Sequence, residues 1–167
     1  MLNDNDKGIF TVMTSNNVED LPPELTRAGR LDGIFYFNLP AIEERKEIFK
    51  IHMNKKNIKV SDKVINEIAE NTEGYTGAEI ELIVKLSMRK AFMRCKKENK
   101  NFDVTIEDLL AAKEDVIPVS ESSKEKIEQL ETWVKGRAIY ANGKPAKTQK
   151  KKISNDAIKS ASKLLSK

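Results

Sequence analysis

The amino-acid sequence predicts a mainly α-helical protein with a small β part. Between residues 41 and 135, apolar residues recur every three or four positions, which is the period of helices buried on one side. Only two short segments near the start of the chain are rich in β-branched and aromatic residues. Aromatic residues make up 6% of the chain and it holds only 7 glycines, which also favours helices over a large sheet.

Composition limits the classes of protein to which the chain can belong. With 167 residues, of which 39% are hydrophobic and 34% charged, it can bury the core of one domain and carry a tail. One cysteine and one histidine exclude an internal disulfide and a zinc cluster. No apolar run is long enough to cross a bilayer, and no signal peptide precedes the first expected strand. A cytoplasmic location without a membrane partner is therefore expected.

Two strands are expected before the helices. Residues 8–14 predict a buried strand, because this run lacks charge and contains mostly β-branched and aromatic side chains. Residues 34–39 predict a second, short strand that Pro40 ends. The polar cluster Ser15-Asn16-Asn17 follows the first strand, at a position where open α/β sheets place ligand contacts.

The rest of the chain predicts helices with recognisable starts. Thr76 and Glu79 form the pattern of a capping box at the beginning of the longest helix. Ser61 and Thr105 are expected to cap two other helices. The expected helices cover residues 41–54, 62–69, 77–98, 106–112 and 120–135. The first four are too short to be stable alone and are expected to pack as a small bundle.

Two arginines mark the segment between the two expected strands. Pro22-Pro23 opens a short helical turn, and Arg27 and Arg30 follow, three residues apart. Two forked, permanently charged groups on one side suit a polyanion such as a triphosphate. Most surface arginines are simply solvated, so the pair alone would be a weak signal.

The whole run from Thr14 to Asp32 is more specific. It resembles the stretch of AAA-clade ATPases that joins the sensor-1 strand to the arginine fingers, whose usual form is T-N-x-P-x-x-L-D-P-A-L-x-R-x-G-R-F-D. The resemblance implies that Asn16 is the sensor-1 asparagine, which orients the attacking water. It also implies that Arg27 and Arg30 are fingers acting on the nucleotide of an adjacent subunit. Two positions depart from the usual form, Pro22 for Asp and Leu31 for Phe.

Two further words resemble the helical lid of the same clade. His52, in Phe49-Lys50-Ile51-His52, matches a histidine that lies near the adenine, although an interfacial histidine on a half-buried helix is the alternative. Gly77 and Ala78 match the G-x-x-G-A-[DE]-[IL] word that opens the third lid helix. Their small side chains let a ligand approach the free amides of the helix N-terminus, although a helix cap explains the word nearly as well. Here, as in the clade, no sensor-2 arginine occurs.

The C-terminal quarter narrows the resemblance. Residues 133–138 resemble the W-x-K-G-R-A word of a little-characterised single-module AAA family from cyanobacteria and plastids, and Trp133 is expected to anchor this end onto the lid or a neighbouring subunit. Residues 142–167 are lysine-rich and expected to be disordered. Nucleic-acid binding by this tail is a weaker interpretation, because no aromatic residue interleaves the lysines.

These observations predict the carboxyl-terminal half of an AAA module. The expected parts are a piece of the α/β nucleotide-binding domain (1–40), the lid (41–115), a helical extension (116–141) and the tail (142–167). The family implies ATP with Mg²⁺, yet the sequence holds neither a Gly-x-x-x-x-Gly-Lys-Ser/Thr loop nor an apolar strand ending in Asp-Glu. No metal ligands are therefore assigned, and no hydrolysis is expected from the chain alone.

The expected partners are other AAA subunits, in a hexamer, or the N-terminal half of the module. Two alternatives remain open on the sequence. One is a helical module for protein contacts or assembly, and the other is a nucleic-acid binder that acts through the basic tail.

Overall fold

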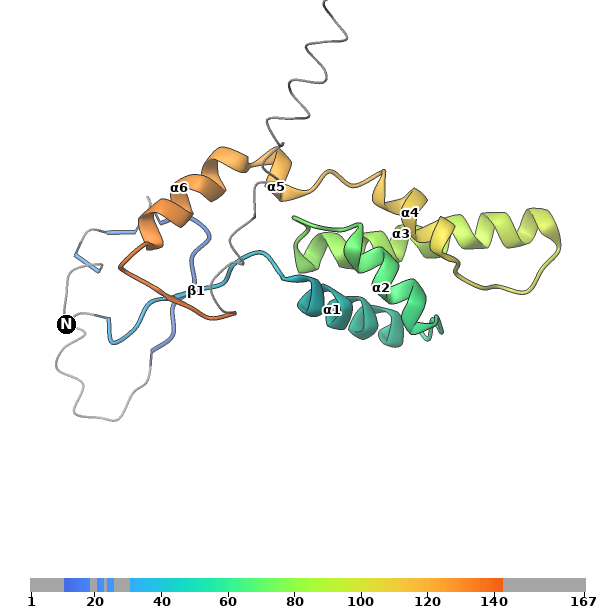
Figure 1. Cartoon of the computed structure of the whole chain (residues 1–167), viewed down its shortest axis with the longest axis horizontal. Coiled ribbons are helices and arrows are strands. Elements are labelled where there is room, and N and C mark those ends of the chain that lie inside the picture. The colour runs from blue at the N-terminus through green and yellow to red at the C-terminus, as the bar shows by residue number, and fades with distance from the viewer. Residues whose placement is uncertain (1–10, 19–20, 23, 26–30, 143–167) are drawn as a thin grey trace, which may run out of the picture.

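A computed structural model describes residues 11–18, 21–22, 24–25 and 31–142 of the chain. Figure 1 shows helices α1 to α4 gathered in one bundle, with β1 and α6 on the other side of the molecule. The elements are β1 (Phe35–Tyr36), α1 (Ile42–Lys55), α2 (Asp62–Glu70), α3 (Gly77–Glu98), α4 (Ile106–Lys113), α5 (Val119–Ser122), α6 (Lys124–Val134) and β2 (Ile139–Tyr140). The predicted fold class, mainly α with a small β part, is confirmed.

The four-helix bundle forms around α3, which packs against both α1 and α4, while α2 closes the side between them. Its core contains side chains that the sequence placed at helical spacing, and the largest fully buried ones are Phe49, Met53, Ile68, Ile80, Ile83 and Leu109. Helices α1, α2 and α4 have 14, 9 and 8 residues and are marginal in water alone, so burial of these apolar faces holds the bundle together. The predicted bundle is confirmed.

Capping boxes start the two helices for which threonine caps were expected. At α3, the Thr76 hydroxyl oxygen accepts the Glu79 N–H at 3.3 Å, and the Glu79 carboxylate accepts the Thr76 N–H at 2.7 Å. Thr105 and Asp108 make the same exchange at α4. Ser61 does precede α2, but its side chain makes no capping hydrogen bond. The sequence thus located these helix starts, because caps act within one turn.

The β part differs from the prediction. The strand expected over residues 8–14 is wrong for residues 11–14, its described part, which have no regular structure and expose Val12 and Met13. A strand is stable only beside a hydrogen-bonded neighbour, and no strand in the described part of the chain pairs with this segment. The second expected strand is real but covers only Phe35–Tyr36 instead of residues 34–39.

The sequence did not predict β2. It pairs in parallel with β1, so that Phe35 faces Ile139 and Tyr36 faces Tyr140. The two tyrosine rings meet edge to face, with centroids 5.4 Å apart. Chain segments about a hundred residues apart thereby form one sheet.

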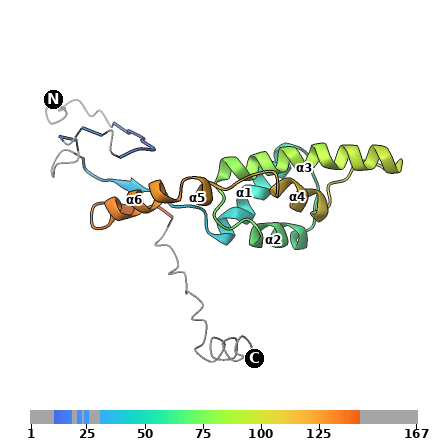
Figure 2. The ribbon, with the colours of Figure 1, turned by 90° about the horizontal axis from the view of Figure 1, so that it is seen from above.

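The helix expected over residues 120–135 occurs as two pieces. Ser123 has non-helical backbone angles (φ −134, ψ 34), and its carbonyl accepts the first hydrogen bond of α6, from Ile127 N–H at 3.1 Å. These angles end α5 at Ser123 and start α6 after it, although the Ser123 side chain makes no capping hydrogen bond. Figure 2 shows α5 and α6 leading the chain away from the bundle toward β1.

Hydrogen bonds fix the connection between the sheet and the bundle. The Asn142 amide oxygen accepts the Asn38 N–H at 3.0 Å, and its NH₂ donates to the Asn38 carbonyl at 3.2 Å and to Glu44 at 3.3 Å. Buried Arg45 donates to the carbonyls of Pro40, at 2.8 Å, and Ala69, at 3.0 Å. Burial lowers the pKa of Arg45, and the nearby Glu73 carboxylate opposes this change.

No helix in the described ranges combines the length and the hydropathy needed to span a bilayer. The division of the chain at residues 40, 115 and 141 stays a prediction.

Candidate functional site

The N-terminal end of α3 lies against the second half of α1. A Cβ atom at Gly77 would lie 3.8 Å from Ile48 Cδ1. One turn further along each helix, Glu81 of α3 lies near His52 of α1. Three of the six predicted site residues, His52, Gly77 and Ala78, are therefore brought to one end of the bundle. His52 is half-buried there and Ala78 is exposed.

Charge at this end is balanced locally. Lys85 Nζ bonds the Glu81 carboxylate at 2.8 Å, and this hydrogen bond is the main reason why the pKa of Glu81 lies below its ordinary value. His52 and Lys55, both on α1, lower it further. The surface beside His52 thus carries a carboxylate that remains ionised at neutral pH and stays close to cationic side chains.

The cap of α3 leaves two amides available. The N–H groups of Glu79 and Ile80 are used by the Thr76 side chain and carbonyl. The N–H groups of Gly77 and Ala78 have no acceptor within the helix, because the first amides of any helix lack one. The Glu79 carboxylate offsets the positive end of the helix dipole. This end therefore suits a neutral hydrogen-bond acceptor better than a phosphate.

The loop before α3 is fixed by the C-terminal extension. Gly74 has a φ of +84°, and a Cβ added there would overlap the Ser120 side chain. The Tyr75 hydroxyl donates to the Val116 carbonyl at 2.9 Å, and burial raises the pKa of Tyr75. Sequence reasoning treated both residues only as letters of a family word. A glycine beside an aromatic residue indicates a turn with a buried ring, but it does not indicate which segment of the chain packs against them.

The other predicted site residues lie elsewhere or outside the description. Asn16 is exposed at a bend, beside a local turn in which the Ser15 hydroxyl donates to the Asn17 carbonyl at 2.6 Å. The expected turn after it is present, since Leu25 N–H bonds the Pro22 carbonyl at 2.9 Å. Arg27 and Arg30 lie outside the described residues, so their pairing stays a prediction.

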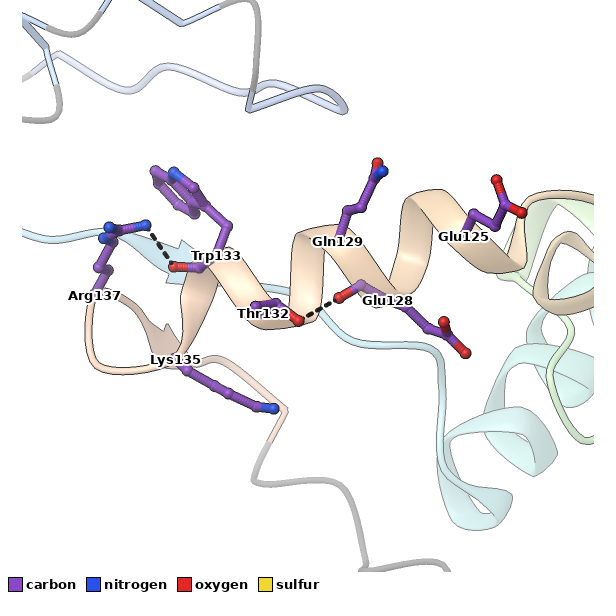
Figure 3. A pocket seen from close by; sticks show the side chains of 7 residues that line it. All are labelled: Glu125, Glu128, Gln129, Thr132, Trp133, Lys135 and Arg137. Carbon is purple, nitrogen blue, oxygen red and sulfur yellow. Dashed lines mark hydrogen bonds between the residues drawn. The ribbon is translucent and has the colours of Figure 1, made fainter.

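A shallow hollow on α6 was not predicted. Figure 3 shows the Trp133 ring and the Arg137 guanidinium next to one another at its end. Arg137 Cζ lies 5.5 Å from the ring centroid, a cation–π distance, and Arg137 also donates to the Trp133 carbonyl at 3.3 Å. The hollow is lined by Glu125, Glu128, Gln129, Thr132, Trp133, Lys135 and Arg137. Trp133 is half-buried, and its predicted role as an anchor stays a prediction.

Within the described part of the chain, no three His, Cys, Asp or Glu side chains are gathered in a way that would hold a metal ion.

Comparison with known proteins identifies the bundle. Residues 62–111, which run from the start of α2 into α4, match the family model of the AAA+ lid domain. These residues belong to the AAA+ lid domain family. The match includes the start of α3, with Gly77 and Ala78. His52 lies outside the match, on α1.

Relatives extend the similarity beyond the lid. The AAA domain-containing protein ycf46 of Guillardia theta is 37% identical over 132 residues, which cover 78% of this chain and 25% of that protein. The ATPase family AAA domain-containing protein 2 of Homo sapiens is 44% identical over 75 residues, covering 45% of this chain and 5% of that protein. The chain thus spans about a quarter of the length of its ycf46 relatives.

A solved structure shows the same fold. The crystal structure of the FIGL-1 AAA domain in complex with ADP superposes with a TM-score of 0.60 at 20% sequence identity, covering 72% of this chain and 42% of that one. At this identity the likeness concerns the fold alone. The AAA+ lid of this chain and the sheet piece beside it therefore have the arrangement of the C-terminal part of an AAA domain.

Proposed function

We propose that this chain supplies the lid and the C-terminal sheet piece of an AAA-type nucleoside triphosphatase, and that the end of the lid formed by α1 and α3 contacts the nucleotide. The observation that supports this most is that His52 lies near Glu81, one turn into α3 from Gly77 and Ala78, whose amides have no acceptor within the helix. The FIGL-1 AAA domain, which shares the fold, was solved with ADP.

The residues at this end fit one part of ATP. A half-buried imidazole suits the edge of a purine base, and two amides without helical partners suit a neutral acceptor on the base or ribose. The Glu79 carboxylate disfavours the phosphates at the same place. The base and ribose are thus assigned to the lid, and residues that hold the phosphates and Mg²⁺ are not assigned to this chain.

The remaining predicted residues belong to the same proposal. ATP supplies the phosphoanhydride bond when it is bound. The Asn16 amide would hold a water, and Arg27 and Arg30 would present their guanidinium groups to the nucleotide of a neighbouring AAA subunit in a hexamer. The chain by itself is proposed to be inactive in hydrolysis, and the assembly is proposed to work in the cytoplasm.

The proposal is tested with the full chain mixed with the α/β nucleotide-binding part of the Guillardia theta relative. Binding of fluorescent ATP and ADP is measured for the parent chain and for His52→Ala. Loss of one base contact is expected to weaken both nucleotides about tenfold, which corresponds to about 1.4 kcal/mol. Lys59→Ala, an exposed change after α1, is the matched control and should leave both affinities unchanged. Equal nucleotide affinities of His52→Ala and the parent chain would contradict the base contact.

A further inference from the structure

Helix α3 is apolar on two opposite faces. One face is buried in the bundle and contains Ile80, Ile83, Val84, Ser87, Ala91 and Cys95. At 100° per residue, Leu82, Phe92 and Met93 fall on the other side of the helix. They are 44%, 59% and 64% exposed. A helix that packs on one side needs only one apolar stripe, so the bundle does not account for these three side chains.

The same outward face is basic. Lys85, Arg89 and Lys96 lie between and beside the apolar residues at helical spacing, and together with Leu82, Phe92 and Met93 they define the outer stripe of α3. Lys85 is paired with Glu81 at the near end. Residues 82–97 contain no Asp or Glu, so Arg89 has no carboxylate on the turns of α3 that flank it, and Glu98, two residues after Lys96, bonds Lys100 at 2.9 Å. A partner that complements this stripe would supply carboxylates to Arg89 and Lys96.

Side-chain contacts join the far half of α3 to α4 and to the residues before and after α4. Figures 1 and 2 show this half of α3 extending beyond α1 and α2. On its inner side Arg94 bonds Asp108 at 2.9 Å and Asp103 at 3.1 Å, and the Cys95 thiol donates to Asp103 at 3.3 Å. Lys90 bonds Asp115, just after α4, at 2.8 Å. A surface fixed in this way loses little conformational freedom when it binds a partner.

We propose that the outer stripe of α3 binds an acidic amphipathic helix of a partner protein. Phe92 and Met93 pack on the apolar side of that helix, and Arg89 and Lys96, one turn to either side of them, pair with its carboxylates. Phenylalanine, methionine and arginine are the residue types enriched in protein interfaces. A nucleic-acid strand fits less well, because bases stack on a series of aromatic rings and the stripe holds one aromatic side chain among aliphatic ones.

The test uses the full chain and a fluorescein-labelled synthetic helical peptide. Its heptads carry leucine and phenylalanine on one side and glutamate on the flanks. Fluorescence anisotropy is expected to show micromolar binding that weakens with added salt. The double variants Phe92→Ser/Met93→Ser and Arg89→Glu/Lys96→Glu should each weaken binding by at least about tenfold.

Matched controls lie off the stripe. Ile117→Ser removes an apolar side chain that is 70% exposed in the link after α4, and Lys63→Glu reverses an exposed charge on α2. Both should bind the peptide like the parent chain. All the changed side chains face solvent, so every variant is expected to fold. Circular dichroism and urea midpoints check this.

Several results would overturn the proposal. These are an absence of peptide binding, equal binding of a peptide in which lysine replaces every glutamate, or binding that neither double variant weakens. Sedimentation that shows self-association lost in both double variants would assign the stripe to a second copy of this chain. Oligonucleotide binding that Arg89→Glu/Lys96→Glu abolishes and Phe92→Ser/Met93→Ser preserves would assign it to nucleic acid.

Discussion

Asp108 joins the start of α4 to the far half of α3, and its removal should destabilise the lid. Only 6% of the Asp108 side chain is exposed. It accepts the Thr105 N–H at 3.0 Å as part of the capping box, and the Arg94 guanidinium at 2.9 and 3.2 Å. Both the local cap and the contact between helices therefore depend on one side chain.

The magnitude follows from these contacts. Loss of the acceptor for the Thr105 N–H costs about 1 kcal/mol. A hydrogen bond to a charged group contributes about 1.5–3 kcal/mol, and the lower end applies because 26% of the Arg94 side chain is exposed to water. Asp108→Ala is therefore expected to lower the free energy of unfolding by about 2–3 kcal/mol, measured by urea denaturation followed by circular dichroism. Glu128→Gln, an exposed change on α6, is the control and should match the parent chain.

The effect should also depend on pH. Burial raises the pKa of Asp108, but hydrogen bonds from Arg94 and Thr105 outweigh burial, so the pKa lies below its ordinary value. A carboxylate whose pKa is lower in the folded state stabilises the fold above its unfolded pKa of about 3.9 and loses this contribution as pH falls through the folded value. The difference between parent and Asp108→Ala should therefore be full at pH 7 and shrink below about pH 4.

Two outcomes would refute this reasoning about Asp108. One is a loss of stability at pH 7 no larger than that of the Glu128→Gln control. The other is a double-mutant cycle with Arg94→Ala in which the two losses simply add, since coupled partners must lose less together than the sum of their single losses.

Two further predictions concern the loop and the connection that hold the lid in place. Gly74→Ala should cost about 1–3 kcal/mol, because alanine is strained at positive φ and its Cβ overlaps Ser120, and Ser120→Gly should recover part of this loss in thermal melts. Asn142→Ala removes three hydrogen bonds and should speed amide hydrogen exchange at Asn38 about tenfold, as expected for about 1–1.5 kcal/mol of lost local stability, with no change at Leu109 in the core. Equal exchange rates at Asn38 in the parent chain and in Asn142→Ala would show that the Asn142 contacts do not hold this connection.

The sequence by itself determined the helices and the family. Thr76 and Thr105 predicted the starts of α3 and α4. A capping box is made by residues three positions apart, so it can be recognised in the sequence. Apolar spacing predicted helices that bury one side, although α3 also exposes Leu82, Phe92 and Met93 on its opposite side. The lid resemblance drawn from the word around Gly77 and Ala78 agrees with the family match over residues 62–111, and His52 lies outside that range.

Only the tertiary structure decided which distant segments meet. The strand expected over residues 8–14 had the right composition, but composition does not supply a hydrogen-bonded neighbour. The pairing of β1 with β2 and the Asn142 contact with Asn38 join positions about a hundred residues apart. No local pattern indicated that Arg94 bonds Asp108, a carboxylate on the next helix. Local sequence patterns predict interactions within one or two turns of the chain. The partner of a buried charge or of an unpaired strand edge depends on how distant segments pack.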